Sequence, residues 1–191
     1  MFYLILGLIV FLGLHSIRIF AEDWRSAQIA LRGEAAYKGV YSLVSAIGLG
    51  LIIWGYGQTR IAPLDLYQAP AFTRHIASLL MLFSFVLLVC AYVPGTRLKG
   101  KLHHPMIISV KIWAFAHLIA NGRLGDVLLF VAFLIWANFD LRAARARDRK
   151  LGTSYAAGSW GRDGLALLIG IAAWWLFARY GHAWLIGVSP F

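Results

Sequence analysis

The sequence predicts an all-α integral membrane protein, a polytopic bundle of about six transmembrane helices. Of its 191 residues, 61% are hydrophobic and only 14% are charged. The charged residues are gathered in a few short clusters, and long uncharged stretches separate them. This pattern is typical of a polytopic membrane protein and leaves no room for a soluble domain. We therefore expect residues 1–191 to form a single transmembrane domain.

The uncharged stretches give the spans in order. The first, Phe2–Ile17, has no basic residue before it and no small-residue cleavage site after it, so we expect a retained helix rather than a signal peptide. Two stretches without any charge follow, and the fourth is broken only by Lys111. Extended to their polar flanks, all reach about 20 residues. The later five stretches are Gly39–Thr59, Ile76–Thr96, Met106–Gly122, Val127–Phe139 and Gly164–Ala178.

Local signals support these helices. Pro105 precedes the fourth stretch and suits the first turn of a helix, where its missing N–H costs nothing. The single cysteine, Cys90, lies in the third span and excludes a disulfide framework or a thiolate metal site. Small residues allow membrane helices to approach closely, so we expect the glycines of the spans to mark helix contacts. They are Gly7, Gly13, Gly48, Gly50, Gly55, Gly57, Gly164 and Gly170.

The basic residues predict the orientation. If the N-terminus faces outward, 13 of the 18 Lys and Arg residues fall on the inner side. Basic residues favour the cytoplasmic side of a membrane, so we expect a bacterial inner-membrane protein with both termini in the periplasm. The cluster Arg142–Lys150 indicates contact with anionic membrane lipids rather than with nucleic acid.

Two histidines lie inside apolar runs, where ionisable side chains are costly and usually functional. His15 shares a helical face with Gly7, Phe11 and Arg18. Such a face suits a planar anionic cofactor, because the glycine leaves room for a macrocycle and the arginine can bind a propionate. The alternative to a cofactor ligand is that His15 only forms a hydrogen bond with a neighbouring helix.

The second histidine, His117, shares its helical face with Trp113 and Asn121. Lys111 lies on another face of the same helix, aligned with His104. A lysine at this depth costs about 2.5–3.5 kcal/mol on insertion scales unless it snorkels or finds a partner. Lys111 and Asn121 are therefore expected to be buried polar residues of a site.

Several segments resemble the NnrU family of bacterial membrane proteins, whose members are associated with denitrification, in the handling of nitrite and nitric oxide. A relative of that family is the 15-cis-zeta-carotene isomerase, a membrane enzyme that contains haem b. The likeness extends from the first span to the last residues. The matching segments are Phe11–Arg18, Tyr41–Ser45, His104–Met106, Lys111–Gly122 and Leu185–Pro190.

The resemblance implies a haem b cofactor with His15 and His117 as axial ligands. Because Arg18 and Trp113 share helical faces with these histidines, we expect them to lie beside the cofactor. The isomerase has a cysteine three residues before its second ligand, whereas this chain has Ala114 there. The resemblance thus carries over bis-imidazole ligation but not the isomerase substrate. It also implies a hydrophobic or gaseous ligand, redox chemistry, and a nitric oxide or nitrite reductase as partner.

The depths of the two histidines leave other ligand sets open. At 1.5 Å per residue, His15 lies about 20 Å and His117 about 5 Å from the outer side. Axial ligands should lie at similar depths. His15 paired with His104, or an outer cluster of His75, His117 and His182, are the alternatives.

Two other functions compete. His104-Pro105-Met106 and the segment Asp148–Tyr155 resemble the isoprenylcysteine carboxyl methyltransferase group, which binds S-adenosylmethionine, although a glutamate of that pattern is missing after His104. The third possible function is that the protein is a non-catalytic partner that helps to assemble or regulate a nitrite or nitric oxide reductase. Whether the protein is an enzyme stays open at this point.

Overall fold

The computed structural model describes residues 1–190, and no strand occurs among them. Their only β features are two isolated bridges, Asp65 with Arg123 and Thr96 with Ser159. The prediction of an all-α fold is confirmed. The helices are α1 (Phe2–Phe20), α2 (Glu22–Arg32), α3 (Glu34–Thr59), α4 (Thr73–Tyr92), α5 (Arg97–Leu102), α6 (Pro105–Ala120), α7 (Leu124–Leu151), α8 (Trp160–Leu176), the π-helical turn η1 (Phe177–Gly181) and α9 (His182–Ile186).

Within residues 1–190, five helical segments are long and apolar enough to cross a membrane: α1, α3, α4, α7 and the continuous run Trp160–Ile186. These segments confirm the polytopic prediction. The fourth expected span corresponds to α6, which has 16 residues. It rises only about 24 Å, less than the hydrocarbon thickness of about 30 Å. As expected, α6 begins at Pro105.

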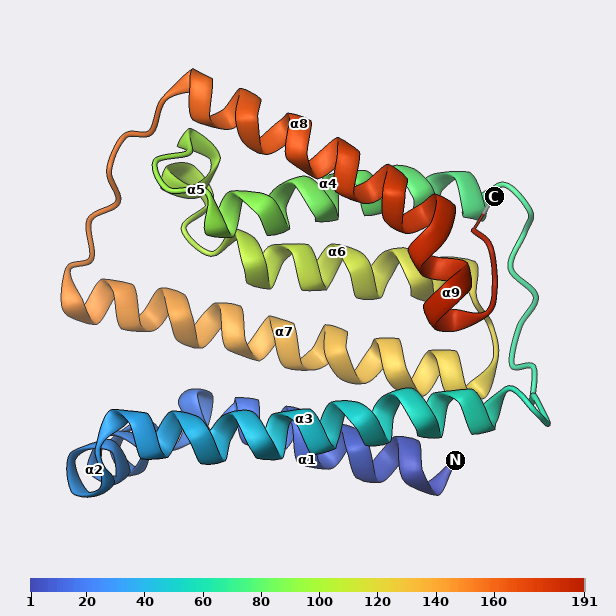
Figure 1. Ribbon diagram of the computed structural model, residues 1–191, viewed down its shortest axis with the longest axis horizontal. Helices are drawn as coiled ribbons and strands as arrows, with labels where there is room; N and C mark the ends of the chain where they lie inside the picture. The colour runs from blue at the N-terminus through green and yellow to red at the C-terminus, as the bar shows by residue number, and fades with distance from the viewer. Residues whose placement is uncertain (191) are drawn as a thin grey trace.

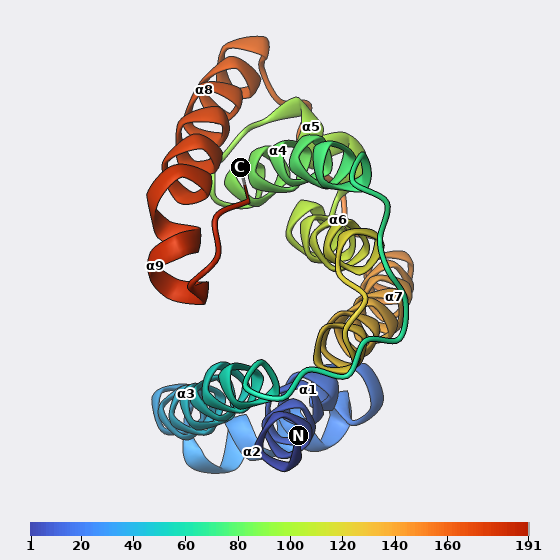
Figure 2. The same ribbon diagram turned by 90° about the vertical axis from the view of Figure 1, so that its right-hand side faces the viewer.

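The spans are arranged as an open arc (Figure 2). Neighbouring helices pack in the order α3, α1, α7, α6, α4 and α8, which differs from their order along the chain. The ends of the arc, formed by α3 and by α8 with α9, lie on the same side in Figure 2. Helix α7 therefore separates the first helical pair from α6, and this arrangement decides which histidines can meet.

Glycines make the contact between α1 and α3. A Cβ atom added at Gly7 would lie 2.6 Å from the backbone nitrogen of Ile52, and one at Gly48 would lie 2.9 Å from that of Phe11. Gly55 packs equally closely on the backbone of Leu4. Such close approach is how small residues stabilise helix pairs in lipid. The first apolar stretch is thus an integral part of the bundle.

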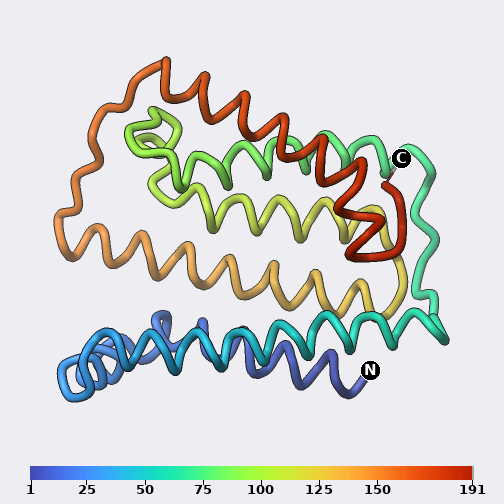
Figure 3. The backbone as a smooth tube through the Cα atoms, viewed as in Figure 1, coloured from blue at the N-terminus to red at the C-terminus, as the bar shows by residue number. Residues whose placement is uncertain are grey.

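The two ends of the molecule differ in charge. Both termini lie at one end, and α2, α5 and the end of α7 lie at the other (Figures 1 and 3). The predicted grouping of basic residues into two sides therefore agrees with the fold.

Helix α2 was missed in the sequence because it is short and charged; none of its residues is buried. An amphipathic helix of this kind typically lies along the membrane surface.

Candidate functional site

His15 lies in an aromatic cluster between α1, α3 and α7. Its Nδ1 donates a 2.7 Å hydrogen bond to the carbonyl of Phe11, so its Nε2 is left as an acceptor or ligand atom. The ring stacks on Phe11 at 4.2 Å and meets Tyr41 and Trp136 edge-on at 5.3 and 6.0 Å. Among residues 1–190, the buried indole nitrogen of Trp136 has no hydrogen-bond partner. The cluster therefore has an unused hydrogen-bond donor.

His117 lies near the opposite end of the bundle, on α6. Its Nδ1 donates a 2.9 Å hydrogen bond to the carbonyl of Trp113, which again leaves Nε2 free. The Asn121 amide donates to the carbonyl of His117 at 2.8 Å. The ring lies 4.9 Å from Phe130 and 5.7 Å from Trp113, between ring centres. Trp113 and Asn121 thus flank His117 as the sequence predicts.

The His117 ring lies beside the ring of His182, the first residue of α9. The two imidazoles lie 16° from parallel with their centres 6.4 Å apart. The Nδ1 of His182 donates a 2.6 Å hydrogen bond to the carbonyl of Val188. Phe177 meets the His182 ring edge-on at 5.9 Å. Both histidines therefore have a fixed tautomer with Nε2 available.

The structure does not bring His15 and His117 together. His15 contacts Trp136 and His117 contacts Phe130, two residues of α7 that are six positions apart. At 1.5 Å per residue this separation is about 9 Å along α7, which has the expected direction but is smaller than the expected difference in depth of about 15 Å. Phe133 lies between the clusters, with ring centres 5.9 Å from Phe11 and 5.2 Å from Trp113.

The prediction that His75, His117 and His182 form an outer cluster is wrong. His75 is exposed in the first turn of α4 and makes no contact with His117 or His182. Within residues 1–190, no group of three or more His, Cys, Asp or Glu side chains is placed to hold a metal ion. Of these three histidines, His117 and His182 have their rings side by side.

Arg18 faces away from a buried site. Its side chain is 59% exposed and lies 3.8 Å from the Glu22 carboxylate at the surface. The Arg147 guanidinium donates to the carbonyl of Arg18 at 2.9 Å, which connects α1 with the end of α7. The proposed role of Arg18 in binding a propionate group of the haem therefore stays a prediction.

A polar cluster occupies the basic end of the molecule. His104 Nε2 lies 2.9 Å from Asp148 Oδ2, and the Tyr155 hydroxyl donates to the same oxygen at 2.9 Å. Burial, together with the bond to Asp148, raises the pKa of Tyr155. The His103 ring stacks on Tyr155 at 4.2 Å, 7° from parallel. The fold thus joins the segment around His104 to the segment Asp148–Tyr155. It does not join His104 to His15.

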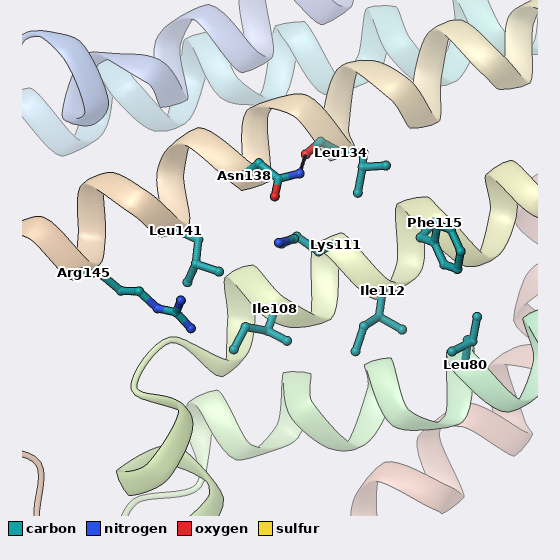
Figure 4. A pocket seen from close by; sticks show the side chains of 9 residues that line it. All are labelled: Leu80, Ile108, Lys111, Ile112, Phe115, Leu134, Asn138, Leu141 and Arg145. Carbon is teal, nitrogen blue, oxygen red and sulfur yellow. Dashed lines mark hydrogen bonds between the residues drawn. The ribbon is translucent and has the colours of Figure 1, made fainter.

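Lys111 lines an open groove on the surface between α6 and α7 (Figure 4). Asn138 and Arg145 of α7 line the same groove, and the remaining walls are apolar. The sequence indicates Lys111 as a buried polar residue. Asn138 and Arg145 were missed because their proximity to Lys111 depends on how α7 packs on α6.

Comparison with known proteins gives one match. No curated protein and no solved structure matches the chain. The family model described as NnrU protein matches residues 3–190, almost the whole length of 191 residues. This match covers every span and both histidine clusters described above. The chain therefore belongs to the NnrU family.

Proposed function

We propose that this NnrU-family membrane protein binds haem b at the end of the bundle where both termini lie, with His117 as one axial ligand and His182 as the other. The observation that supports this proposal most strongly is the pair of nearly parallel imidazoles 6.4 Å apart. A metal–imidazole bond is about 2 Å long. Two such bonds, each extended to the ring centre, require ring centres about 6 Å apart.

The hydrogen bonds of the two histidines support the same role. Metal-ligating histidines usually donate their second ring nitrogen to a carbonyl or carboxylate, which fixes the tautomer and the ring orientation. His117 and His182 donate Nδ1 to the carbonyls of Trp113 and Val188. The aromatic rings of Trp113, Phe130 and Phe177 surround the pair and suit a flat apolar group.

His15 with His117 is the second arrangement, as the family resemblance implies. The free Nε2 of His15 and the unpaired indole nitrogen of Trp136 favour a ligand beside the first cluster. A haem between these clusters requires α7 to leave room near Phe133. The first arrangement is favoured by the spacing of the His117 and His182 ring centres, which is close to that of two imidazoles on one metal ion.

Held by two imidazoles, haem b would supply electron transfer, and it would supply nitric oxide binding if one imidazole were released. The two proposed ligands differ in how firmly the chain holds them. His117 lies within α6, which packs on both α4 and α7. His182 begins the five-residue helix α9, which packs mainly on the adjoining turn η1. His182 is therefore the ligand suited to leave, and we propose a redox or nitric-oxide-binding role in denitrification, in the bacterial inner membrane.

A methyltransferase is the second candidate function, and one observation favours it. The two segments that resemble the methyltransferase group meet at His104, Asp148 and Tyr155. Binding of labelled S-adenosylmethionine to the purified protein, reduced by Asp148→Asn, would support this function. A reductase that copurifies with an inactive protein would instead support a role in assembly or regulation.

Absorption spectra of the purified protein test the haem proposal. We expect a Soret band and reduced bands of a six-coordinate b-type haem. His117→Ala should abolish these bands, and His182→Ala should convert the spectrum to that of a five-coordinate or water-ligated haem. His75→Ala is the matched control, because that histidine is exposed and makes no contact in either cluster.

The spectra also separate the two arrangements. Loss of the six-coordinate spectrum in His15→Ala, with no change in His182→Ala, would assign the axial pair to His15 and His117. A wild-type protein without a Soret band, when expressed with excess haem precursor, would show that the proposal is wrong.

A further inference from the structure

We propose that the groove between α6 and α7 binds one anionic phospholipid, whose phosphate lies between Lys111 and Arg145. The groove encloses about 570 Å³ and opens toward the surface of the bundle. Figure 4 shows the ammonium group of Lys111 directed into the space between the two helices, with Arg145 at the end nearer the basic side. This site is separate from both histidine clusters and from the proposed haem.

The two cations of the groove lack partners within the protein. Among residues 1–190, neither Lys111 nor Arg145 has a hydrogen bond or an ion pair. Asn138 donates its amide to the carbonyl of Leu134 and carries no charge that could neutralise them. A charged side chain within a membrane span is costly unless it is paired. A bound anion would remove this cost.

The apolar lining of the groove indicates which kind of molecule the bound anionic group belongs to. Apart from the polar residues, the lining is aliphatic or aromatic, and it runs from Leu141 near Arg145 to Leu80 on α4. Such a surface fits an acyl chain and offers nothing to a free phosphate ion. The main lining side chains are Leu80, Ile108, Ile112, Phe115, Leu134 and Leu141.

The charge beyond Arg145 favours an acidic lipid over a neutral one. Arg145 also lines a second pocket of about 630 Å³, which therefore adjoins the groove at this residue. Lys101 and Arg149 belong to that pocket. Its carboxylate, Asp148, is already engaged by His104 and Tyr155. A zwitterionic headgroup would place its own cation against these basic residues, whereas phosphatidylglycerol would not.

Spin-labelled lipids test this proposal in vesicles that contain the purified protein. Electron paramagnetic resonance measures the fraction of label immobilised by the protein. We expect phosphatidylglycerol to be immobilised more than phosphatidylcholine by the wild-type protein. Lys111→Met and Arg145→Gln should each weaken this preference about fivefold, the effect of removing one basic contact at a membrane surface. Soluble glycerol 1-phosphate should not displace the lipid.

Arg142→Gln is the matched control. Arg142 is exposed on α7 one turn before Arg145, carries the same charge and does not line either pocket. It should keep the wild-type preference. Equal immobilisation of the two lipids by the wild-type protein would overturn the proposal without any variant. Equal losses in Arg142→Gln and Arg145→Gln, or displacement by glycerol 1-phosphate, would also overturn it.

Discussion

The Tyr56 hydroxyl donates a 2.6 Å hydrogen bond to the carboxylate of Asp126. Tyr56 lies near the end of α3, and Asp126 lies in the first turn of α7. The second carboxylate oxygen of Asp126 accepts from the backbone N–H of Arg123 at 3.3 Å. Asp126 is only 5% exposed, so both bonds satisfy a buried carboxyl group. This contact connects the first helical pair to the rest of the arc.

Tyr56→Phe should destabilise the protein by about 1.5–3 kcal/mol, the usual contribution of a hydrogen bond to a charged group. Unfolding by detergent titration, followed by tryptophan fluorescence, measures this change. Tyr92→Phe should have no comparable effect because Tyr92 is 72% exposed. An unchanged midpoint for Tyr56→Phe would show that the hydrogen bond contributes little.

Gly55→Ala should weaken the contact between α1 and α3. The added methyl group would meet the backbone of Tyr3 and Leu4, which cannot move aside as a side chain can. Overpacking of this kind costs about 1–3 kcal/mol. Gly50→Ala is the control on the same helix, since nothing lies within 4 Å of its added Cβ. The same unfolding assay should show a loss only for Gly55→Ala.

The two ends of the bundle should face opposite sides of the membrane. A phosphatase reporter fused after the last residue should be active, because the end that carries both termini has fewer basic residues and is expected in the periplasm. The same reporter inserted between residues 152 and 158 should be inactive. The reverse pattern would show that the orientation is wrong.

The proposed haem should carry no thiolate ligand in either oxidation state. The resemblance described above implies a cysteine at the position of Ala114, and the only cysteine of the sequence, Cys90, is fully buried against Val86 and Ala166. Electron paramagnetic resonance of the ferric protein should therefore show a low-spin histidine-ligated signal. Cys90→Ser should leave it unchanged. A thiolate-type signal that disappears in this variant would contradict the assignment.

The spans could be predicted because the bilayer imposes their length and apolar composition. The start of α6 could be predicted for a local reason, because the missing N–H of Pro105 costs nothing in the first turn of a helix. Helix α2 could not be found this way, since a surface helix keeps its charges. The sequence also identified His117 and its neighbour Trp113, which are four residues apart on one helix.

Contacts between distant helices were harder to predict. The proximity of His117 and His182 depends on the course of the chain after α8. The position of Lys111 and Arg145 along the same groove depends on the packing of α7 on α6. His15 was matched to His117 through the resemblance, but the insertion of α7 between α1 and α6 separates their rings. Helix order in the membrane is a long-range property that spacing along the sequence does not contain.

The π-helical turn η1 gives the position of His182 an unusual dependence on chain length. A π turn holds one more residue than an α turn. Each residue of an α-helix advances the direction of the side chains by about 100°. Deletion of one residue within α8 would therefore rotate His182 by about 100° away from His117, whereas deletion of one residue from Phe177–Gly181 would return the π turn to an α turn and leave His182 close to its present direction. The pairing of the two imidazoles thus depends on the helical register of α8, and η1 is a turn in which a one-residue change of length can be absorbed without loss of that pairing.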